Sequence, residues 1–132
     1  MNYALLVLAS PFSGTGSLTA ARFAEAALGR GHHIARVFFL DQGVGAGMAT
    51  AVSPQGEADP VARWADLAAR HDLELVLCVS SALKRGLLDD TEAARYEREA
   101  HTVHPAFEIG GLGLLVEATA QADRVVTFGG SA

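Results

Sequence analysis

The chain has 132 residues, of which 50% are hydrophobic and 19% are charged, so it is long and apolar enough for one domain with a core. Its formal net charge of -5 argues against a nucleic-acid-binding surface, which would carry an excess of basic residues. Its single cysteine excludes an intramolecular disulfide and a Cys-x-x-Cys redox pair.

Hydrophobic runs and turn signals predict alternating strands and helices. Residues 3–10 and 33–40 are near-continuous apolar runs, typical of strands buried on both faces, and residues 18–29 between them have helical spacing. This order predicts a βαβ unit with parallel strands. The remaining expected elements are a helix at 59–70, a strand at 73–79, a short helix at 80–85, a polar helix or helical loop at 89–100, a strand at 106–109, a helix at 111–122, a strand at 124–128 and a frayed end at 129–132.

These elements predict a single α/β domain over residues 1–132, a three-layer α/β/α sandwich around a mostly parallel five-stranded sheet of flavodoxin-like architecture. In such sheets, functional sites gather at the carboxyl ends of the strands. Three segments would meet there: the first loop at 10–17, the long loop at 41–57 and the segment around Cys78. A loop as long as 41–57 is usually functional or a contact surface.

The sequence gives no sign of a membrane segment or of export. No apolar run approaches the roughly 20 residues of a membrane-spanning helix, and the N-terminal segment lacks the basic region of a signal peptide. We therefore expect a soluble, cytoplasmic protein.

Cys78 stands where the third predicted strand ends and a helix begins. Ser80 and Ser81 are good N-cap residues, and Lys84 and Arg85 follow within about one helical turn. The positive end of a helix dipole and nearby cations both favour the thiolate, the reactive form of cysteine. The pattern predicts a reactive Cys78 supported by these four residues. The alternative is a small, buried, structural cysteine.

Other kinds of site are less well supported. Residues 13–17, Ser-Gly-Thr-Gly-Ser, loosely resemble the phosphate loop of flavodoxins but lack the Gly-Lys-Ser/Thr ending of a Walker A loop, which favours an ordinary turn. A flavin- or nucleotide-binding module is kept as the alternative. The five histidines do not form a zinc-ligand cluster, and whether His101 or His104 reaches Cys78 as a base stays open.

Several motifs together resemble the TusD/DsrE family of sulfur-carrier subunits over nearly the full length. The most specific is residues 77–86, Leu-Cys-Val-Ser-Ser-Ala-Leu-Lys-Arg-Gly, combined with Gly-Gly-Leu-Gly at 110–113. The others are Ser-Pro-Phe-Ser-Gly-Thr at 10–15, Val-Phe-Phe at 37–39, Asp-Gln-Gly-Val at 41–44, Asp-Asp-Thr-Glu-Ala at 89–93, Glu-Ala at 117–118 and Ala-Asp-Arg-Val-Val at 122–126.

The resemblance implies a DsrE-like fold and a sulfurtransferase in which Cys78 accepts a sulfur atom as a persulfide and passes it on, without a metal or an organic cofactor. It implies a heterohexamer with TusC/DsrF-like and TusB/DsrH-like paralogues, two copies of each, a TusA-like sulfur donor and a TusE/DsrC-like acceptor. In the TusD branch the relay ends in 2-thiolation of the wobble uridine of certain tRNAs. In the DsrE branch it serves the oxidation of stored sulfur.

The sequence does not separate the two branches, and we expect the tRNA branch with the DsrE branch as its alternative. A purely structural subunit, whose active cysteine lies in a paralogue, is a further possibility. That alternative predicts a buried and unreactive Cys78.

Overall fold

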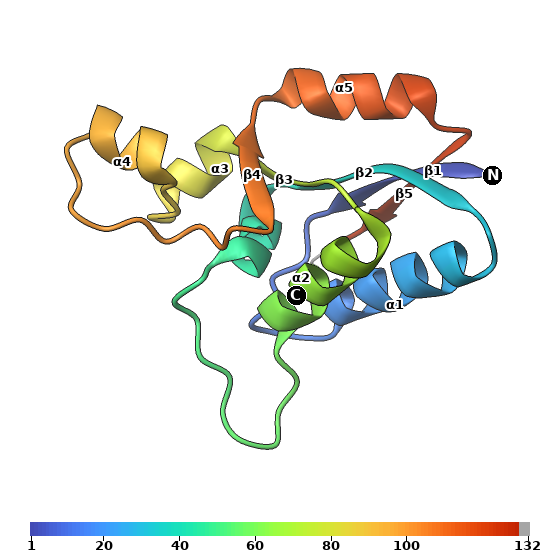
Figure 1. Ribbon diagram of the computed structural model, residues 1–132, viewed down its shortest axis with the longest axis horizontal. Coiled ribbons are helices and arrows are strands. Elements are labelled where there is room, and N and C mark those ends of the chain that lie inside the picture. Colours follow the sequence, from blue (N-terminus) through green and yellow to red (C-terminus); the bar gives the residue numbers. More distant parts are fainter. Residues whose placement is uncertain (130–132) are drawn as a thin grey trace.

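The computed structural model describes residues 1–129, and its centre is a five-stranded parallel sheet (Figure 1). The strand order is β4-β3-β2-β1-β5, and every neighbouring pair is parallel. The strands are β1 (Asn2–Val7), β2 (His33–Phe39), β3 (Leu75–Cys78), β4 (Phe107–Gly110) and β5 (Arg124–Phe128). The predicted α/β class and five-stranded sheet are confirmed. Of the frayed end predicted at 129–132, only residue 129 lies within the described residues.

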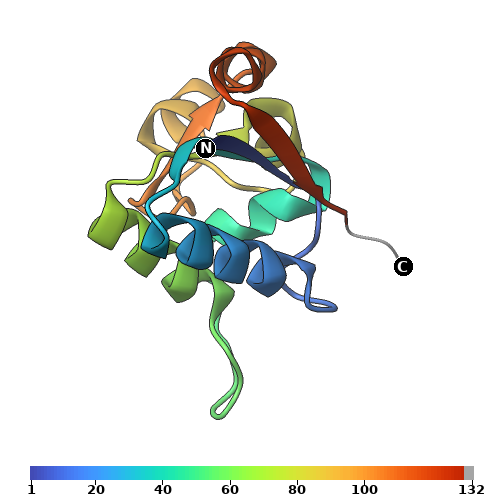
Figure 2. The same ribbon diagram turned by 90° about the vertical axis from the view of Figure 1, so that its right-hand side faces the viewer.

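Helices cover both faces of the sheet and make the three predicted layers. Helices α1 (Gly16–Gly29) and α2 (Pro60–His71) lie on one face, and α5 (Leu112–Gln121) lies on the other (Figures 1 and 2). The short helices α3 (Val79–Lys84) and α4 (Asp90–Arg95) lie beyond the carboxyl end of β3 (Figure 1). Among the described residues, no helix combines the length and the apolar character that crossing a bilayer requires.

Capping residues explain where two of the helices begin. The side chain of Asp59 accepts a hydrogen bond from the N–H of Ala62 at 3.1 Å, and Pro60 occupies the first position of α2, as its sequence predicts. Asp89 caps α4 in the same way through the N–H of Glu92 at 2.8 Å. Helix α4 ends at Arg95, so the prediction of a helical segment reaching residue 100 was too long.

The segment 41–57 is not one continuous loop, which corrects the prediction. Its first part is a 3-10 helix, η1 (Asp41–Gly47), whose five residues from Gly43 onward are buried. A β-carbon at Gly43 would collide with the backbone carbonyl of Val7, so glycine is needed there for close packing against β1. Only the part that follows η1 projects from the body as an exposed loop (Figure 2).

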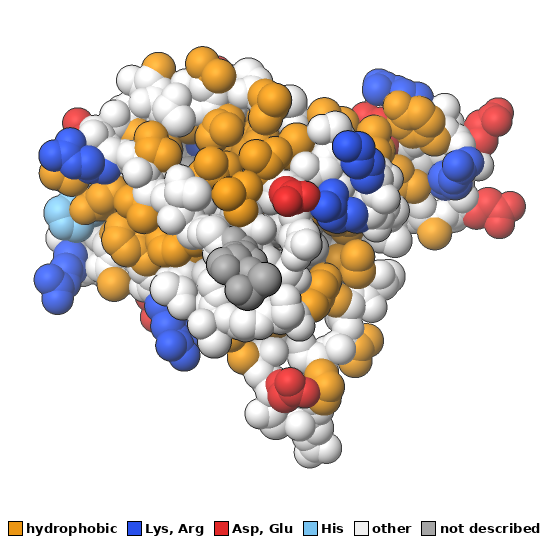
Figure 3. Space-filling view, turned by 180° about the vertical axis from the view of Figure 1, so that it is seen from behind, with side chains coloured by type: hydrophobic (Ala, Val, Ile, Leu, Met, Phe, Trp, Pro, Cys, Tyr) orange, Lys and Arg blue, Asp and Glu red, His pale blue; other side chains and the backbone are white. Residues whose placement is uncertain are grey.

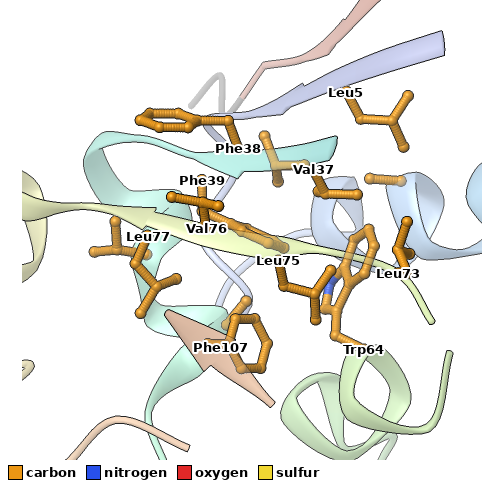
Figure 4. Packing of buried hydrophobic residues seen from close by; sticks show 14 of the residues in the cluster. Leu5, Val37, Phe38, Phe39, Trp64, Leu73, Leu75, Val76, Leu77 and Phe107 are labelled. Carbon is orange, nitrogen blue, oxygen red and sulfur yellow. The ribbon is translucent and has the colours of Figure 1, made fainter. Parts of the chain in front are cut away.

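An aromatic group lies between the sheet and α2. The indole ring of Trp64 meets Phe39 edge to face with ring centroids 5.1 Å apart, and Phe39 in turn meets Phe107 at 5.6 Å (Figure 4). Trp64 is fully buried, and its indole N–H donates to the hydroxyl of Ser17 at 3.1 Å, which ties α2 to the first turn of α1. Aliphatic residues complete the core on this face of the sheet: Leu5, Val37, Leu73, Leu75 and Leu77.

Candidate functional site

Cys78 is the last residue of β3 and also the N-cap of α3. It pairs with Gly110 of β4 in the sheet, and its extended backbone (φ -58°, ψ 126°) is followed at once by the helical Val79. The helix therefore begins one residue earlier than the sequence suggests. Ser80 and Ser81 lie in its first turn and are not the N-cap residues that we predicted, because the cap position falls on the cysteine itself.

The thiol of Cys78 is buried but has polar groups beside it. The residue is 2% exposed, and its sulfur lies 3.6 Å from the hydroxyl oxygen of Ser80. Burial by itself raises the pKa of Cys78, but the backbone N–H of Ser81, the hydroxyls of Ser80 and Ser81 and the N–H of Ser80 favour the thiolate and bring the pKa below its ordinary value. The Cys78 side chain makes no capping hydrogen bond of ordinary geometry. The N–H groups of Ser80 and Ser81 therefore act on the sulfur as nearby dipoles.

The two predicted cations lie at the other end of α3. Lys84 is its last residue and is exposed, and Arg85 follows it. A helix of six residues is about 9 Å long, so neither cation lies beside the sulfur in the way that Ser80 and Ser81 do. The guanidinium of Arg85 donates to a carboxylate oxygen of Asp41 at 2.6 Å, which offsets part of its charge.

Asp41 is a residue of this region that the sequence analysis did not single out as functional. It begins η1 with a left-handed backbone (φ 53°), a conformation that aspartate tolerates better than most residues. Its N–H donates to the hydroxyl oxygen of Ser81 at 2.9 Å. A signal was present in the sequence, because an acidic residue that follows a buried parallel strand falls at the carboxyl edge of the sheet.

The histidines that were considered as partners of Cys78 bind other groups. The ring of His101 is 3.0 Å from the carboxylate of Asp90. The Nδ1 atom of His104 accepts from the N–H of Ala106 at 3.0 Å. Among residues 1–129, no three His, Cys, Asp or Glu side chains converge in a way that would hold a metal ion.

The first loop offers little room for a flavin. Thr15 is the N-cap of α1, but its side chain makes no capping hydrogen bond. Two hollows adjoin the loop at Phe12, with volumes of about 140 Å³ and about 250 Å³. Pockets for cofactor-sized ligands usually hold roughly 300–1,000 Å³. The geometry at the described residues thus favours an ordinary turn here.

Comparisons with known proteins agree on one family. The sequence model of the DsrE/DsrF-like family matches residues 1–128. An Allochromatium vinosum protein that carries the name sulfurtransferase DsrE is 45% identical over 129 residues, covering 98% of this chain and 99% of that protein. A Pseudomonas aeruginosa protein named as a homolog of sulfurtransferase TusD is 43% identical over 130 residues, covering 98% of each.

A further sequence relative and a solved structure extend the agreement. Sulfurtransferase TusD of Salmonella enteritidis is 38% identical over 128 residues, covering 97% of this chain and 100% of that protein. The crystal structure of the ychN protein from E. coli superposes with a TM-score of 0.76 at 21% sequence identity, covering 97% of this chain and 100% of the other. At that identity, the structural match supports the shared fold alone.

Proposed function

Because this chain belongs to the DsrE/DsrF-like family and its relatives are named sulfurtransferases, we propose that it is a sulfur-relay sulfurtransferase with Cys78 as its persulfide carrier. The observation that carries the proposal is the surroundings of the only cysteine. It lies at the carboxyl edge of a parallel sheet, and the two serines beside it lower its pKa. The test is loading of sulfur onto wild type and Cys78→Ser, which the Discussion describes.

The proposed reaction needs one thiolate and no change in oxidation state overall. The thiolate of Cys78 attacks the outer sulfur of a donor persulfide, a new S–S bond forms, and the donor leaves as a thiolate. The acceptor's thiolate then attacks the outer sulfur on Cys78, which leaves as a thiolate again. A lowered pKa raises the fraction of Cys78 that is present as the nucleophilic thiolate, and it also makes Cys78 a better leaving group. The thiol must stay reduced, which a cytoplasmic location provides.

Burial of Cys78 sets a condition on this reaction. A residue that is 2% exposed does not present its sulfur to another protein without movement of the groups around it. The structural-subunit alternative is supported by the same burial, whereas the lowered pKa supports the carrier role. We propose that partner binding uncovers the thiol, so loading is to be measured with partner subunits present.

For the end product, we propose 2-thiolation of the wobble uridine of tRNA, with sulfur passed from a TusA-like donor to a TusE/DsrC-like acceptor. The relatives that are named TusD favour this branch, and the relative that is named DsrE favours oxidation of stored sulfur. Mass spectrometry of tRNA nucleosides after deletion of the gene separates the two. Loss of 2-thiouridine supports the tRNA branch, and unchanged 2-thiouridine with impaired sulfur oxidation overturns it.

The partners that we propose are TusC/DsrF-like and TusB/DsrH-like paralogues in a heterohexamer. An exposed apolar surface formed by Leu112, Val116 and Val125, here called the α5–β5 surface, supports such contacts (Figure 3). Their exposed fractions are 55%, 65% and 46%. Helix α5 carries a single charged residue, Glu117, and among the described residues β5 pairs only with β1, so its outer edge is open.

A charge placed on the α5–β5 surface should disrupt the complex. We expect Val116→Glu to lower recovery of the co-expressed paralogues about tenfold or more, because a carboxylate would be buried in an apolar contact. The measurement is co-purification followed by size-exclusion chromatography. Ala26→Glu is the matched control, since Ala26 is exposed on α1 at the opposite face of the sheet and should leave recovery unchanged. Equal recovery of both variants would exclude this surface as the interface.

A further inference from the structure

Residues 88–102 leave the body of the molecule after α3 and return to it as one closed loop that carries α4 (Figure 1). The backbone N–H of Thr102 donates to the carbonyl of Leu88 at 2.8 Å, and the Thr102 hydroxyl donates to the carbonyl of Gly86 at 2.6 Å. The two ends of this segment, here called the α4 loop, are therefore fixed to each other directly after α3. A compact loop whose ends are tied together is frequently a functional surface.

A hollow of about 390 Å³, here called the α3–α4 groove, lies between the end of α3 and the α4 loop. Its lining residues are Leu83, Lys84, Gly86, Leu88, Tyr96 and Arg98. Two of them are cationic and none is acidic, because Glu97 and Glu99, the sequence neighbours of Arg98, do not line it. Tyr96 is 46% exposed, and an exposed aromatic ring beside leucine side chains is typical of a surface that contacts another molecule.

The two cations of the groove have no acidic partner within residues 1–129. Lys84 and Arg98 are both exposed, and neither takes part in an ion pair there. Arg85, which follows Lys84, is by contrast paired with Asp41. The guanidinium of Arg98 is held in place by its hydrogen bond to the carbonyl of Tyr96 at 2.8 Å, which leaves its other N–H groups for a ligand. The groove is thus locally positive on a chain whose formal net charge is -5.

We propose that the α3–α4 groove binds an acidic segment of a partner protein, with carboxylates on Lys84 and Arg98 and apolar side chains on Leu88 and Tyr96. A segment that carries both kinds of side chain matches both properties of the groove. The inference rests on the proposed function, because a relay protein must receive another protein beside its thiol. The groove lies at the end of α3 and Cys78 at its start, about 9 Å apart along a helix of six residues, so one partner can reach both.

The test is fluorescence anisotropy of a labelled, N-acetylated peptide, in which glutamate alternates with leucine, added to the full chain. We expect saturable binding that Lys84→Gln/Arg98→Gln weakens roughly fivefold or more, since both cations of the groove are lost. Arg22→Gln/Arg30→Gln is the matched control, because it removes two exposed cations from α1 and its end, and it should leave binding unchanged. Tyr96→Ser should weaken binding without a change of charge. Circular dichroism confirms that each variant is folded.

A chemical cross-link tests the contact itself, because Lys84 is the only lysine in the chain. A carbodiimide joins an amine to a carboxylate that touches it, so we expect a product that links residue 84 to a glutamate of the peptide. Lys84→Arg keeps the charge but lacks the amine, and it should bind the peptide without forming this product.

Three results would overturn the inference while wild type still loads sulfur with its partners present. The first is equal binding by the two double variants, and the second is a cross-link at Met1 alone. The third is tighter binding of an alternating lysine–leucine peptide or of a uridine oligonucleotide than of the acidic peptide. A wild type that takes up no sulfur with its partners present overturns the proposed function, whatever the peptide does.

Discussion

Replacing Cys78 with serine is expected to abolish sulfur loading without unfolding the protein. A hydroxyl at this position stays protonated at neutral pH and does not attack a persulfide, whereas the thiol of Cys78 has a lowered pKa. Serine is close in size to cysteine and is itself a favourable N-cap residue, so α3 should keep its first turn. The carrier proposal thus predicts complete loss of one chemical step on an intact scaffold.

The measurement is intact mass after incubation with a cysteine desulfurase, cysteine, a TusA-like donor and the partner subunits. We expect a gain of one sulfur atom on wild type, reversed by a reducing agent, and no gain on Cys78→Ser. Ser80→Ala is a useful intermediate, because it removes the hydroxyl 3.6 Å from the sulfur and should slow loading without stopping it. Labelled sulfur on Cys78→Ser would contradict the carrier role, and no gain on either protein would favour the structural-subunit alternative.

Burial and acidity of Cys78 have different consequences for this experiment. The lowered pKa of Cys78 increases the fraction of the thiol that is thiolate. Its 2% exposure limits the access of a partner to the sulfur. Loading that is slow with the donor alone and faster with the partner subunits would mean that access limits the rate. Equal rates in both conditions would mean that the isolated chain already opens often enough.

The elements with strong local signals were predicted well from sequence. Strand β5 has the bounds expected for it, and α2 begins at Pro60 behind its Asp59 cap. In both cases, neighbours in sequence supply the decisive interactions, namely an apolar run between polar residues and a side chain that caps its own helix. The location of Cys78 at the carboxyl edge followed from the order of strands and helices.

The details of the site depended on contacts between distant residues. The sequence predicted that Arg85 supports Cys78 from about one helical turn away, but in the fold its guanidinium pairs with Asp41, which is 44 residues away in sequence. Segment 41–57 was predicted as one long loop, whereas Gly43 lies in a buried 3-10 helix, packed against the backbone of Val7 too closely for a β-carbon. Neither contact produces a periodic pattern in the sequence. Only the packed structure therefore reveals that η1 contacts the first turn of α3.

The second large expected effect concerns the stability of the fold and involves Trp64. We expect Trp64→Ala to lower the free energy of unfolding by about 3–5 kcal/mol, because it empties a fully buried position between α2 and the sheet. The lost contacts include the edge-to-face packing on Phe39 at 5.1 Å (Figure 4). The measurement is urea unfolding followed by far-UV circular dichroism, since the substitution removes the only tryptophan.

Trp64→Phe separates the volume of the indole ring from its hydrogen bond. Phenylalanine keeps most of the packing but leaves the buried hydroxyl of Ser17 without the indole N–H, which should cost about 1–2 kcal/mol. Because Trp64 lies on α2 and not on the elements that surround Cys78, neither variant should shift the pH at which half of Cys78 is thiolate while the protein is folded. A cost below about 1 kcal/mol for Trp64→Ala would contradict the large cavity penalty typical of a closely packed core. A shift of that pH in either folded variant would show that the packing of α2 also affects the ionisation of Cys78.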